Sequence, residues 1–120
     1  MGGLRPELRQ ALYAARQRGG AGAFAPADAL QLATEGGAAC LGRDDIGRLE
    51  PGARADLAIW PGDDLRDMPD SVAALVLGPD RAARHVLAAD EHVVTDGDVV
   101  GTDLRAAHTD LARRARRLWD

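Results

Sequence analysis

The chain has 120 residues, a net charge of −4, and fifteen basic residues that are all arginine. A chain of this length normally forms one domain, and much of its 46% hydrophobic content is alanine with only 3% aromatic residues, so we expect a thin core. The acidic balance argues against a nucleic-acid or membrane-surface role. The single Cys40 cannot form an internal disulfide, and no apolar run is long enough to span a bilayer, so we expect a cytoplasmic protein.

Helices are predicted for the first third of the chain. Over residues 4–18, leucine and alanine recur every three or four positions with arginine mostly off that stripe, which predicts an amphipathic helix ending at Gly19. Pro26 suits the first position of a second helix, and Asp28 complements the positive end of that helix. One more helical turn, 38–41, is expected to end at Gly42.

Short apolar runs follow Asp45 and predict strands. Leu57–Trp60 and Val72–Leu77 are nearly continuous apolar runs, which is typical of buried strands. His85–Ala88 and Glu91–Thr95 are predicted to pair as a hairpin, followed by an Asp96–Gly97 turn.

The last segment, 103–119, is again helical. Asp103 is its expected N-cap, and one apolar face carries Leu104, Ala107, Leu111, Ala115 and Leu118. The order of helices, a cluster of short strands and a final helix predicts an α+β fold.

Candidate reactive residues do not form a catalytic or metal motif. His85, His92 and His108 show no metal-ligand spacing and are expected to be structural or surface residues. Cys40 lies among small apolar residues and is expected to pack as a small hydrophobe. We therefore assign no catalytic, cofactor-binding or metal residues to this chain.

Two charged clusters are given structural interpretations. An acidic segment containing Asp63, Asp64, Asp67 and Asp70 lacks the ligand rhythm of a calcium loop and is expected to be a solvated loop. The arginines at 113, 114, 116 and 117 favour the negative end of a helix over phosphate binding, so no nucleic-acid partner and no membrane partner is predicted.

The segment Ile46–Trp60 contains a Pro51–Gly52 turn that launches an apolar strand, and Asp56 can accept hydrogen bonds from backbone amides at the start of that strand. This segment resembles the signature with which metal-dependent amidohydrolases pass from their catalytic barrel into a small β-sandwich. The segments 4–12, 27–42 and 86–97 also resemble that family in the same order, and the branch they most resemble contains 8-oxoguanine deaminase and hydroxydechloroatrazine ethylaminohydrolase.

The resemblance implies an α+β fragment: terminal helices of a TIM-barrel amidohydrolase over 1–44, a partial composite β-sandwich over 45–102, and a C-terminal helix over 103–120. The family hairpin turns through Asn-Gly, whereas this chain has Ala89–Asp90. Because alanine disfavours the positive φ of that turn, we expect a looser or differently formed turn.

Intact relatives are expected to hydrolyse C–N bonds of purine- or triazine-like rings with a water activated by zinc or iron. The resemblance places the metal ligands upstream of Met1, so this hydrolase-family chain is expected to be a truncated, inactive part. Its expected partner is the missing N-terminal barrel half, or a second copy through exposed edges. The alternative is a non-catalytic partner or self-associating module that completes a split enzyme.

Overall fold

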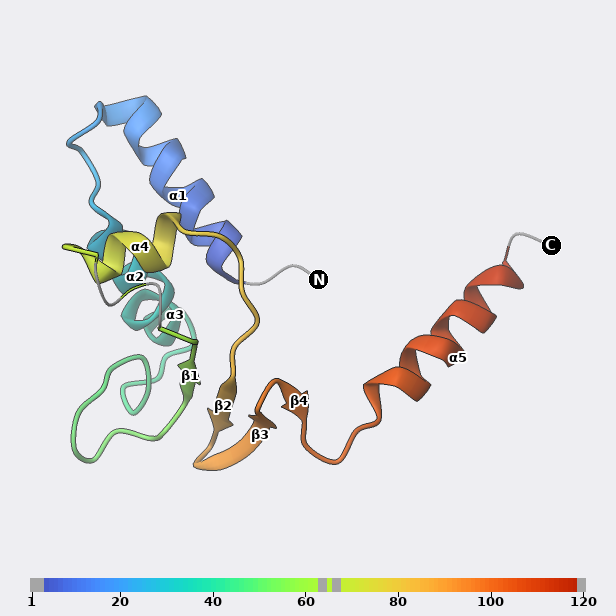
Figure 1. Cartoon of the computed structure of the whole chain (residues 1–120). Helices are drawn as coiled ribbons and strands as arrows, with labels where there is room; N and C mark the ends of the chain where they lie inside the picture. Colours follow the sequence, from blue (N-terminus) through green and yellow to red (C-terminus); the bar gives the residue numbers. More distant parts are fainter. Residues whose placement is uncertain (1–3, 63–64, 66–67, 119–120) are drawn as a thin grey trace.

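The computed structural model describes residues 4–62, 65 and 68–118, and these residues form five helices and four strands (Figure 1). The helices are α1 (Leu4–Gly19), α2 (Pro26–Ala33), α3 (Glu35–Cys40), α4 (Ser71–Leu77) and α5 (Leu104–Arg116). The strands are β1 (Leu57–Ile59), β2 (His85–Ala88), β3 (Glu91–Thr95) and β4 (Asp98–Val99). Helices combined with one antiparallel sheet confirm the predicted α+β class.

The first helices begin and end as their local sequence predicts. α1 ends at Gly19, and the next glycine has a φ of 89°. α2 begins at Pro26, and Asp28 Oδ2 accepts a hydrogen bond from the Ala25 amide at 2.7 Å. Gly42, with a φ of 66°, follows α3 as the predicted left-handed cap.

A small core joins α1, α2 and α4. Leu8, Leu12, Ala29 and Val76 are buried together, with Phe24 and Ala33 packed at the edge. Within the part of the chain that the structure describes, only Leu12 and Val76 are large and fully buried. The thin core predicted from composition is therefore confirmed, and its centre lies among helices, beside the sheet.

The sheet has the order β1-β2-β3-β4, and each neighbouring pair is antiparallel. Leu57 pairs with Leu87 across β1 and β2, and Ala88 pairs with Glu91 at the tip of the β2–β3 hairpin. The hairpin pairing shifts in register at Val86, which marks a bulge-like irregularity. The predicted hairpin and its strand bounds are thus confirmed.

The expected loosening of the hairpin turn is wrong. Ala89 and Asp90 have φ values of 56° and 69°, so the two residues adopt the left-handed conformations of a two-residue type I′ turn. The conformation costs an alanine roughly 1–2 kcal/mol, so surrounding contacts must hold it. Those contacts come from the segment before β1 and are described with the site below.

The strand predicted at Val72–Leu77 is also wrong, because Ser71–Leu77 is helix α4. Asp70 caps this helix by accepting a hydrogen bond from the Ala73 amide at 2.8 Å, and the chain leaves the helix at Gly78. A short apolar run is compatible with either a buried strand or a buried helix, and an Asp at the N-cap favours the helix.

Two expectations about burial are wrong in this chain. Ile59 in β1 is 48% exposed, so this strand is not buried on both faces. Cys40 ends α3 as an exposed free cysteine and does not pack as a core residue. Both residues have apolar sequence neighbours, but the chain provides too little tertiary structure to cover them.

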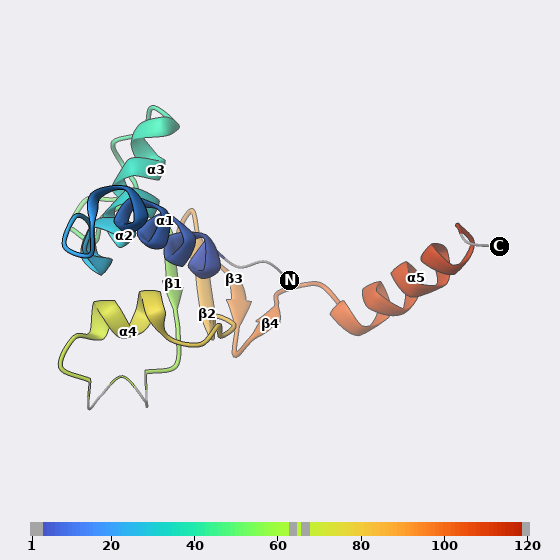
Figure 2. The ribbon, with the colours of Figure 1, turned by 90° about the horizontal axis from the view of Figure 1, so that it is seen from above.

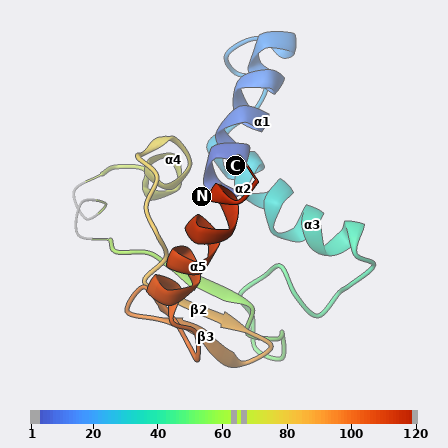
Figure 3. The ribbon, with the colours of Figure 1, turned by 90° about the vertical axis from the view of Figure 1, so that its right-hand side faces the viewer.

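The molecule is extended for its length. Its Cα radius of gyration is 17.5 Å, whereas about 14 Å is usual for a compact domain of this size. Figures 1 and 2 show why: α5 projects from the β4 side of the sheet, whereas α1, α2 and α4 gather on the β1 side. Figure 3, a view from the α5 side, shows the β2–β3 pair below these helices.

The accessible surface is correspondingly large. It measures 9043 Å², whereas a compact monomer of 12.6 kDa exposes roughly 6,200 Å². The difference, about 2,800 Å², exceeds the total area buried in a standard protein–protein interface. The isolated chain thus exposes an additional area that is as large as a complete protein–protein interface.

Candidate functional site

The three histidines do not converge on one site. The rings of His85 and His92 meet edge to face with centroids 6.5 Å apart on neighbouring strands, whereas His108 is on α5. His85 Nε2 lies 3.8 Å from Asp96 Oδ1, an oxygen that also accepts a hydrogen bond from Arg84 Nε at 3.1 Å. Among residues 4–62, 65 and 68–118, no three His, Cys, Asp or Glu side chains are grouped to hold a metal ion.

Most of the predicted acidic cluster, Asp63, Asp64 and Asp67, lies outside the described residues. Its remaining member, Asp70, is the N-cap of α4. The side chain of Asp70 therefore caps a helix, whereas the acidic cluster predicted a solvated loop.

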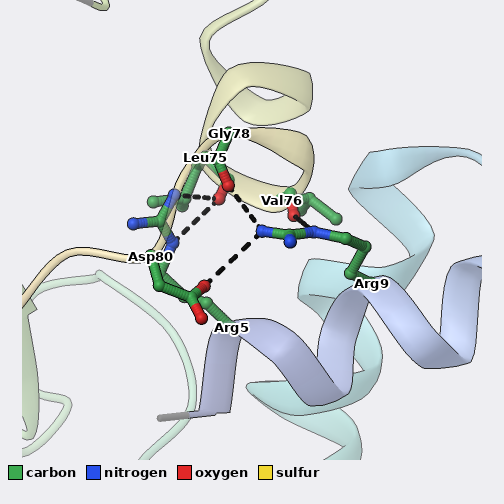
Figure 4. Close-up of polar contacts among 6 residues, drawn as sticks. All are labelled: Arg5, Arg9, Leu75, Val76, Gly78 and Asp80. Carbon is green, nitrogen blue, oxygen red and sulfur yellow. Dashed lines mark hydrogen bonds and ion pairs between the residues drawn. The ribbon is translucent and has the colours of Figure 1, made fainter.

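Two arginines of α1 bind the C-terminal end of α4 (Figure 4). Arg5 is only 8% exposed, and its Nε and Nη2 donate to the Leu75 carbonyl at 2.9 and 2.6 Å. Arg9 donates from Nε to the Val76 carbonyl at 3.3 Å and from Nη2 to the Gly78 carbonyl at 2.5 Å. The last carbonyls of a helix lack intrahelical partners and carry partial negative charge, so these cations satisfy and stabilise them.

Further contacts complete this arginine cluster. Arg9 Nη2 lies 3.5 Å from Asp80 Oδ1, just beyond α4, and the Arg5 guanidinium lies 6.0 Å from the ring centre of Trp60. Arg5 and Arg9 are four residues apart and so share a helix face. The four-residue spacing of the two arginines is visible in the sequence, but α4, whose end they bind, was predicted to be a strand.

A small cavity beside Arg5 is too small for a substrate. Its volume is about 20 Å³, and its walls include Arg5, Trp60, Leu65 and Leu75. Binding pockets for ring-sized ligands are usually hundreds of Å³, whereas this space suits a single water. The arginine cluster is therefore a structural junction between α1, α4 and the residue after β1.

The turn signature has a structural role that its sequence partly predicts. Gly52 has a φ of 92°, as expected for the Pro-Gly turn. Asp56 Oδ1 accepts a hydrogen bond from the Ala89 amide at 2.6 Å, and Asp90 Oδ1 accepts one from the Ala55 amide at 3.0 Å. The amide that binds Asp56 thus belongs to the hairpin tip, not to the start of β1. These reciprocal bonds hold the left-handed turn in place.

The loop before this turn packs on the helices and carries two ion pairs, of which Arg43–Asp45 is half-buried and Arg48–Glu50 is exposed. A Cβ on Gly47, whose φ is 87°, would lie 2.8 Å from the Thr34 carbonyl, so this position requires glycine for both conformation and space. Arg43 donates to both carboxylate oxygens of Asp45 at 2.8 and 2.6 Å, which lowers the pKa of Asp45. The contact of Arg48 with Glu50 raises the pKa of Arg48.

The arginines of α5 include two that make pairs within the helix. Arg113 and Arg114 both bond Asp110, one turn earlier, and Arg114 Nε does so at 2.5 Å. Their location in the last turn agrees with the predicted favourable interaction with the helix dipole. In the described part of the chain, no helix has the length and apolar character needed to cross a membrane.

The fold and the signature segment together define a protein class. Residues 3–101 match the model of the amidohydrolase family, and the chain belongs to this family. The family resemblance of the sequence is thereby confirmed.

Two curated relatives are deaminases. The chain is 48% identical over 103 residues to 8-oxoguanine deaminase from Pseudomonas aeruginosa, covering 83% of the chain and 23% of the deaminase. It is 36% identical over 118 residues to 5-methylthioadenosine/S-adenosylhomocysteine deaminase from Halobacterium salinarum, covering 93% of the chain and 27% of that protein. The chain therefore spans about a quarter of the length of these relatives.

Solved structures show the same relation. An adenosine deaminase from Xanthomonas campestris with bound zinc superposes with a TM-score of 0.86 at 26% identity, covering 95% of this chain and 27% of the deaminase. Atrazine chlorohydrolase from Arthrobacter aurescens TC1 complexed with zinc superposes with a TM-score of 0.80 at 29% identity, covering 91% and 25% respectively. The arrangement of this chain, including its extended shape, thus matches part of much larger folds.

Proposed function

We propose that this chain is the C-terminal part of an amidohydrolase of the deaminase branch and that it does not catalyse a reaction alone. The observation that carries the proposal is the match to 8-oxoguanine deaminase, which covers 83% of this chain but 23% of the deaminase. In the intact enzyme, we expect hydrolysis of a C–N bond on a purine- or triazine-like ring by a metal-activated water.

In this proposal, residues 1–44 are closing helices of the catalytic barrel, 45–102 contribute strands to a composite sandwich, and 103–120 form a terminal helix. The large uncovered surface supports the assignment, since a self-contained domain buries such faces. The exposed Ile59 of β1 agrees with a strand that other parts of a sandwich would cover.

The described residues do not fit a catalytic zinc or iron site. Such a site needs about three protein ligands that meet at one point. The rings of His85 and His92 are neighbours, but the carboxylate near His85, that of Asp96, accepts a hydrogen bond from Arg84. No catalytic step is therefore assigned to this chain, and we propose that the ligands belong to the N-terminal barrel half.

The proposed partner is that barrel half, either in the same polypeptide or as a separate chain. A second candidate function is a non-catalytic partner or self-associating module that completes a split enzyme. The excess surface of about 2,800 Å² fits either arrangement, because it is also enough for a stable interface between separate chains.

A replacement experiment tests the main proposal. The C-terminal quarter of the Pseudomonas 8-oxoguanine deaminase is exchanged for this chain, and ammonia release from 8-oxoguanine and bound zinc are measured. We expect activity from the chimera, none from the deaminase lacking its last quarter, and none from this chain with equimolar zinc. Turnover by the isolated chain would refute its predicted inactivity. A folded, zinc-loaded chimera without activity would refute its competence as the C-terminal part.

A further inference from the structure

Arg84 contacts both members of the only Asp–Gly pair in the sequence. This pair, Asp96–Gly97, forms the two-residue turn between β3 and β4. The Gly97 amide donates a hydrogen bond to the Arg84 carbonyl at 2.8 Å, and Arg84 Nε donates one to Asp96 Oδ1 at 3.1 Å. Arg84 therefore holds the backbone of the turn with its carbonyl and the acidic side chain with its guanidinium.

Arg84 is itself fixed to the sheet. It directly precedes β2, and its amide donates a hydrogen bond to the Ile59 carbonyl of β1 at 2.7 Å. The next residue, His85, places Nε2 3.8 Å from the same Asp96 Oδ1. All of these contacts lie within the part of the chain that the structure describes, so they do not depend on what covers the remaining surface in a larger protein.

An aspartate followed by glycine can rearrange to isoaspartate, because glycine has no side chain to hinder attack by its own amide nitrogen. In the first step the Gly97 nitrogen bonds to Cγ of Asp96, and the amide proton leaves with the carboxyl hydroxyl as water. In the second step water opens the five-membered succinimide ring. Opening at Cγ restores aspartate, whereas opening at the backbone carbonyl carbon leaves the main chain running through Cγ. One water is released and one is consumed, so the rearrangement needs no further reactant.

The folded geometry opposes the first step. Asp96 and Gly97 have φ values of 51° and 89°, which are those of a type I′ turn. The ring can close only after rotation about the Cα–C bond of Asp96, and this rotation leaves the turn and breaks the bond from Gly97 to the Arg84 carbonyl. Moving the carboxyl group towards the nitrogen also breaks its bond to Arg84 Nε.

We propose that Asp96–Gly97 is a site of spontaneous isoaspartate formation and that Arg84 protects it in the folded chain. Modification then follows detachment of the turn from Arg84. The Asp96 side chain is 65% exposed, so the water that opens the ring reaches it. Isoaspartate lengthens the main chain of the turn by one carbon and shortens the side chain, so the contacts with Arg84 do not re-form. The proposal is independent of the reaction that the intact relative catalyses.

The first test incubates the 120-residue chain in water labelled with oxygen-18 at neutral pH, with and without denaturing urea. Each opening of the succinimide puts one labelled oxygen into residue 96, which tandem mass spectrometry localises, and enzymatic methyl esterification detects the isoaspartyl product. We expect labelling to be at least about tenfold slower in the folded chain than in urea, because two hydrogen bonds and the turn must open first. Equal rates would overturn the protection, and no labelling in urea would overturn the site.

Arg84→Met tests the protecting residue. The substitution removes the bond to Asp96 and leaves the backbone carbonyl that binds Gly97. An exposed charged pair is worth little, so we expect labelling of the folded variant to be about two- to fivefold faster and labelling in urea to be unchanged. Arg105→Met is the matched control, because it removes the same charge from an exposed position on α5. Equal effects of the two substitutions, or none, would contradict protection by Arg84.

Asp70 separates local opening from general unfolding. It precedes the small residue Ser71 and is the N-cap of α4, which packs in the helical core. Labelling at Asp70 therefore reports opening of that part of the chain in the same samples. Arg84→Met is expected to raise labelling at Asp96 relative to Asp70. A parallel rise at both sites would show general destabilisation and would refute the local mechanism.

Asp96→Glu verifies the chemistry. Glutamate retains a carboxylate, but attack by the Gly97 nitrogen then requires a six-membered ring, which closes far more slowly. We expect this variant to lose the labelling at residue 96, both folded and in urea. Labelling that persisted there would show that it arises from a reaction other than succinimide formation.

Discussion

Replacing Arg5 by methionine tests whether the junction between α1 and α4 stabilises the chain. The guanidinium is buried and donates two hydrogen bonds to the carbonyl of Leu75, one of the last carbonyls of α4. Methionine preserves much of the aliphatic volume, so the substitution removes the charge and the donors with little loss of packing.

The expected cost follows from the single acceptor. Both donors of Arg5 reach the same Leu75 carbonyl, so they count as one charge-assisted interaction of about 1.5–3 kcal/mol. Arg9 binds other carbonyls, those of Val76 and Gly78, and does not replace the lost donor. We therefore expect Arg5→Met to lower the free energy of unfolding by about 2 kcal/mol, which is large for a chain with so small a core.

Urea denaturation followed by far-ultraviolet circular dichroism measures this change. Arg18→Met is the matched control, because Arg18 is an exposed residue near the other end of the same helix. Its removal is expected to cost less than about 1 kcal/mol, mainly through the helix dipole. Equal losses for the two variants would show that the bonds to Leu75 contribute nothing beyond the general effect of removing a cation from α1.

Three further predictions concern the signature segment, the hairpin turn and the ion pair that precedes the signature segment. Gly47→Ala is expected to lower the free energy of unfolding, measured by urea denaturation, by at least about 2 kcal/mol, because the new Cβ meets the Thr34 carbonyl. Gly52 has a similar φ but open space around it, so Gly52→Ala should lower that free energy by about 1–2 kcal/mol. Equal losses would contradict the steric reason. Ala89→Gly is expected to raise thermal stability by up to about 1 kcal/mol by relieving the positive φ, and destabilisation would refute this. The pKa of Asp45 is lowered in the folded chain, so its pairing with Arg43 stabilises the fold at pH values above the ordinary pKa of 3.8, and this stabilisation is lost as the pH falls through the lower pKa of the folded chain. Asp45→Asn should therefore reduce the loss of folding stability on acidification. An unchanged dependence of stability on pH would disprove the coupling.

Local sequence signals predict much of the secondary structure. Pro26, Asp103 and Gly42 each mark a helix boundary for a local backbone reason, and the structure confirms all three. The hairpin strands are also confirmed, since their alternation and turn signals are local. In the candidate site, too, only local features were predictable. The sequence predicted the Gly52 turn, but it could not predict that Asp56 accepts a hydrogen bond from the Ala89 amide and Asp90 one from the Ala55 amide.

The α4 helix shows where local reasoning fails. The apolar run of six residues, Val72–Leu77, fits a strand or a helix. In the folded chain the helix is held by its partners: Val76 packs with Leu8 and Leu12, and the arginines of α1 bind the helix end. The same limit applies to Cys40 and Ile59, whose apolar surroundings in sequence predicted burial that the tertiary structure does not provide.

The sequence by itself determined the amidohydrolase family and most element boundaries, because motifs, caps and turn residues act over a few positions. Only the tertiary structure decided the state of α4, the burial of Arg5 and the exposure of α5. These depend on which surfaces meet, and contacts between residues about 70 positions apart cannot be read from local periodicity. The physical reason is that burial and helix-end hydrogen bonding are properties of packed pairs of elements rather than of single segments.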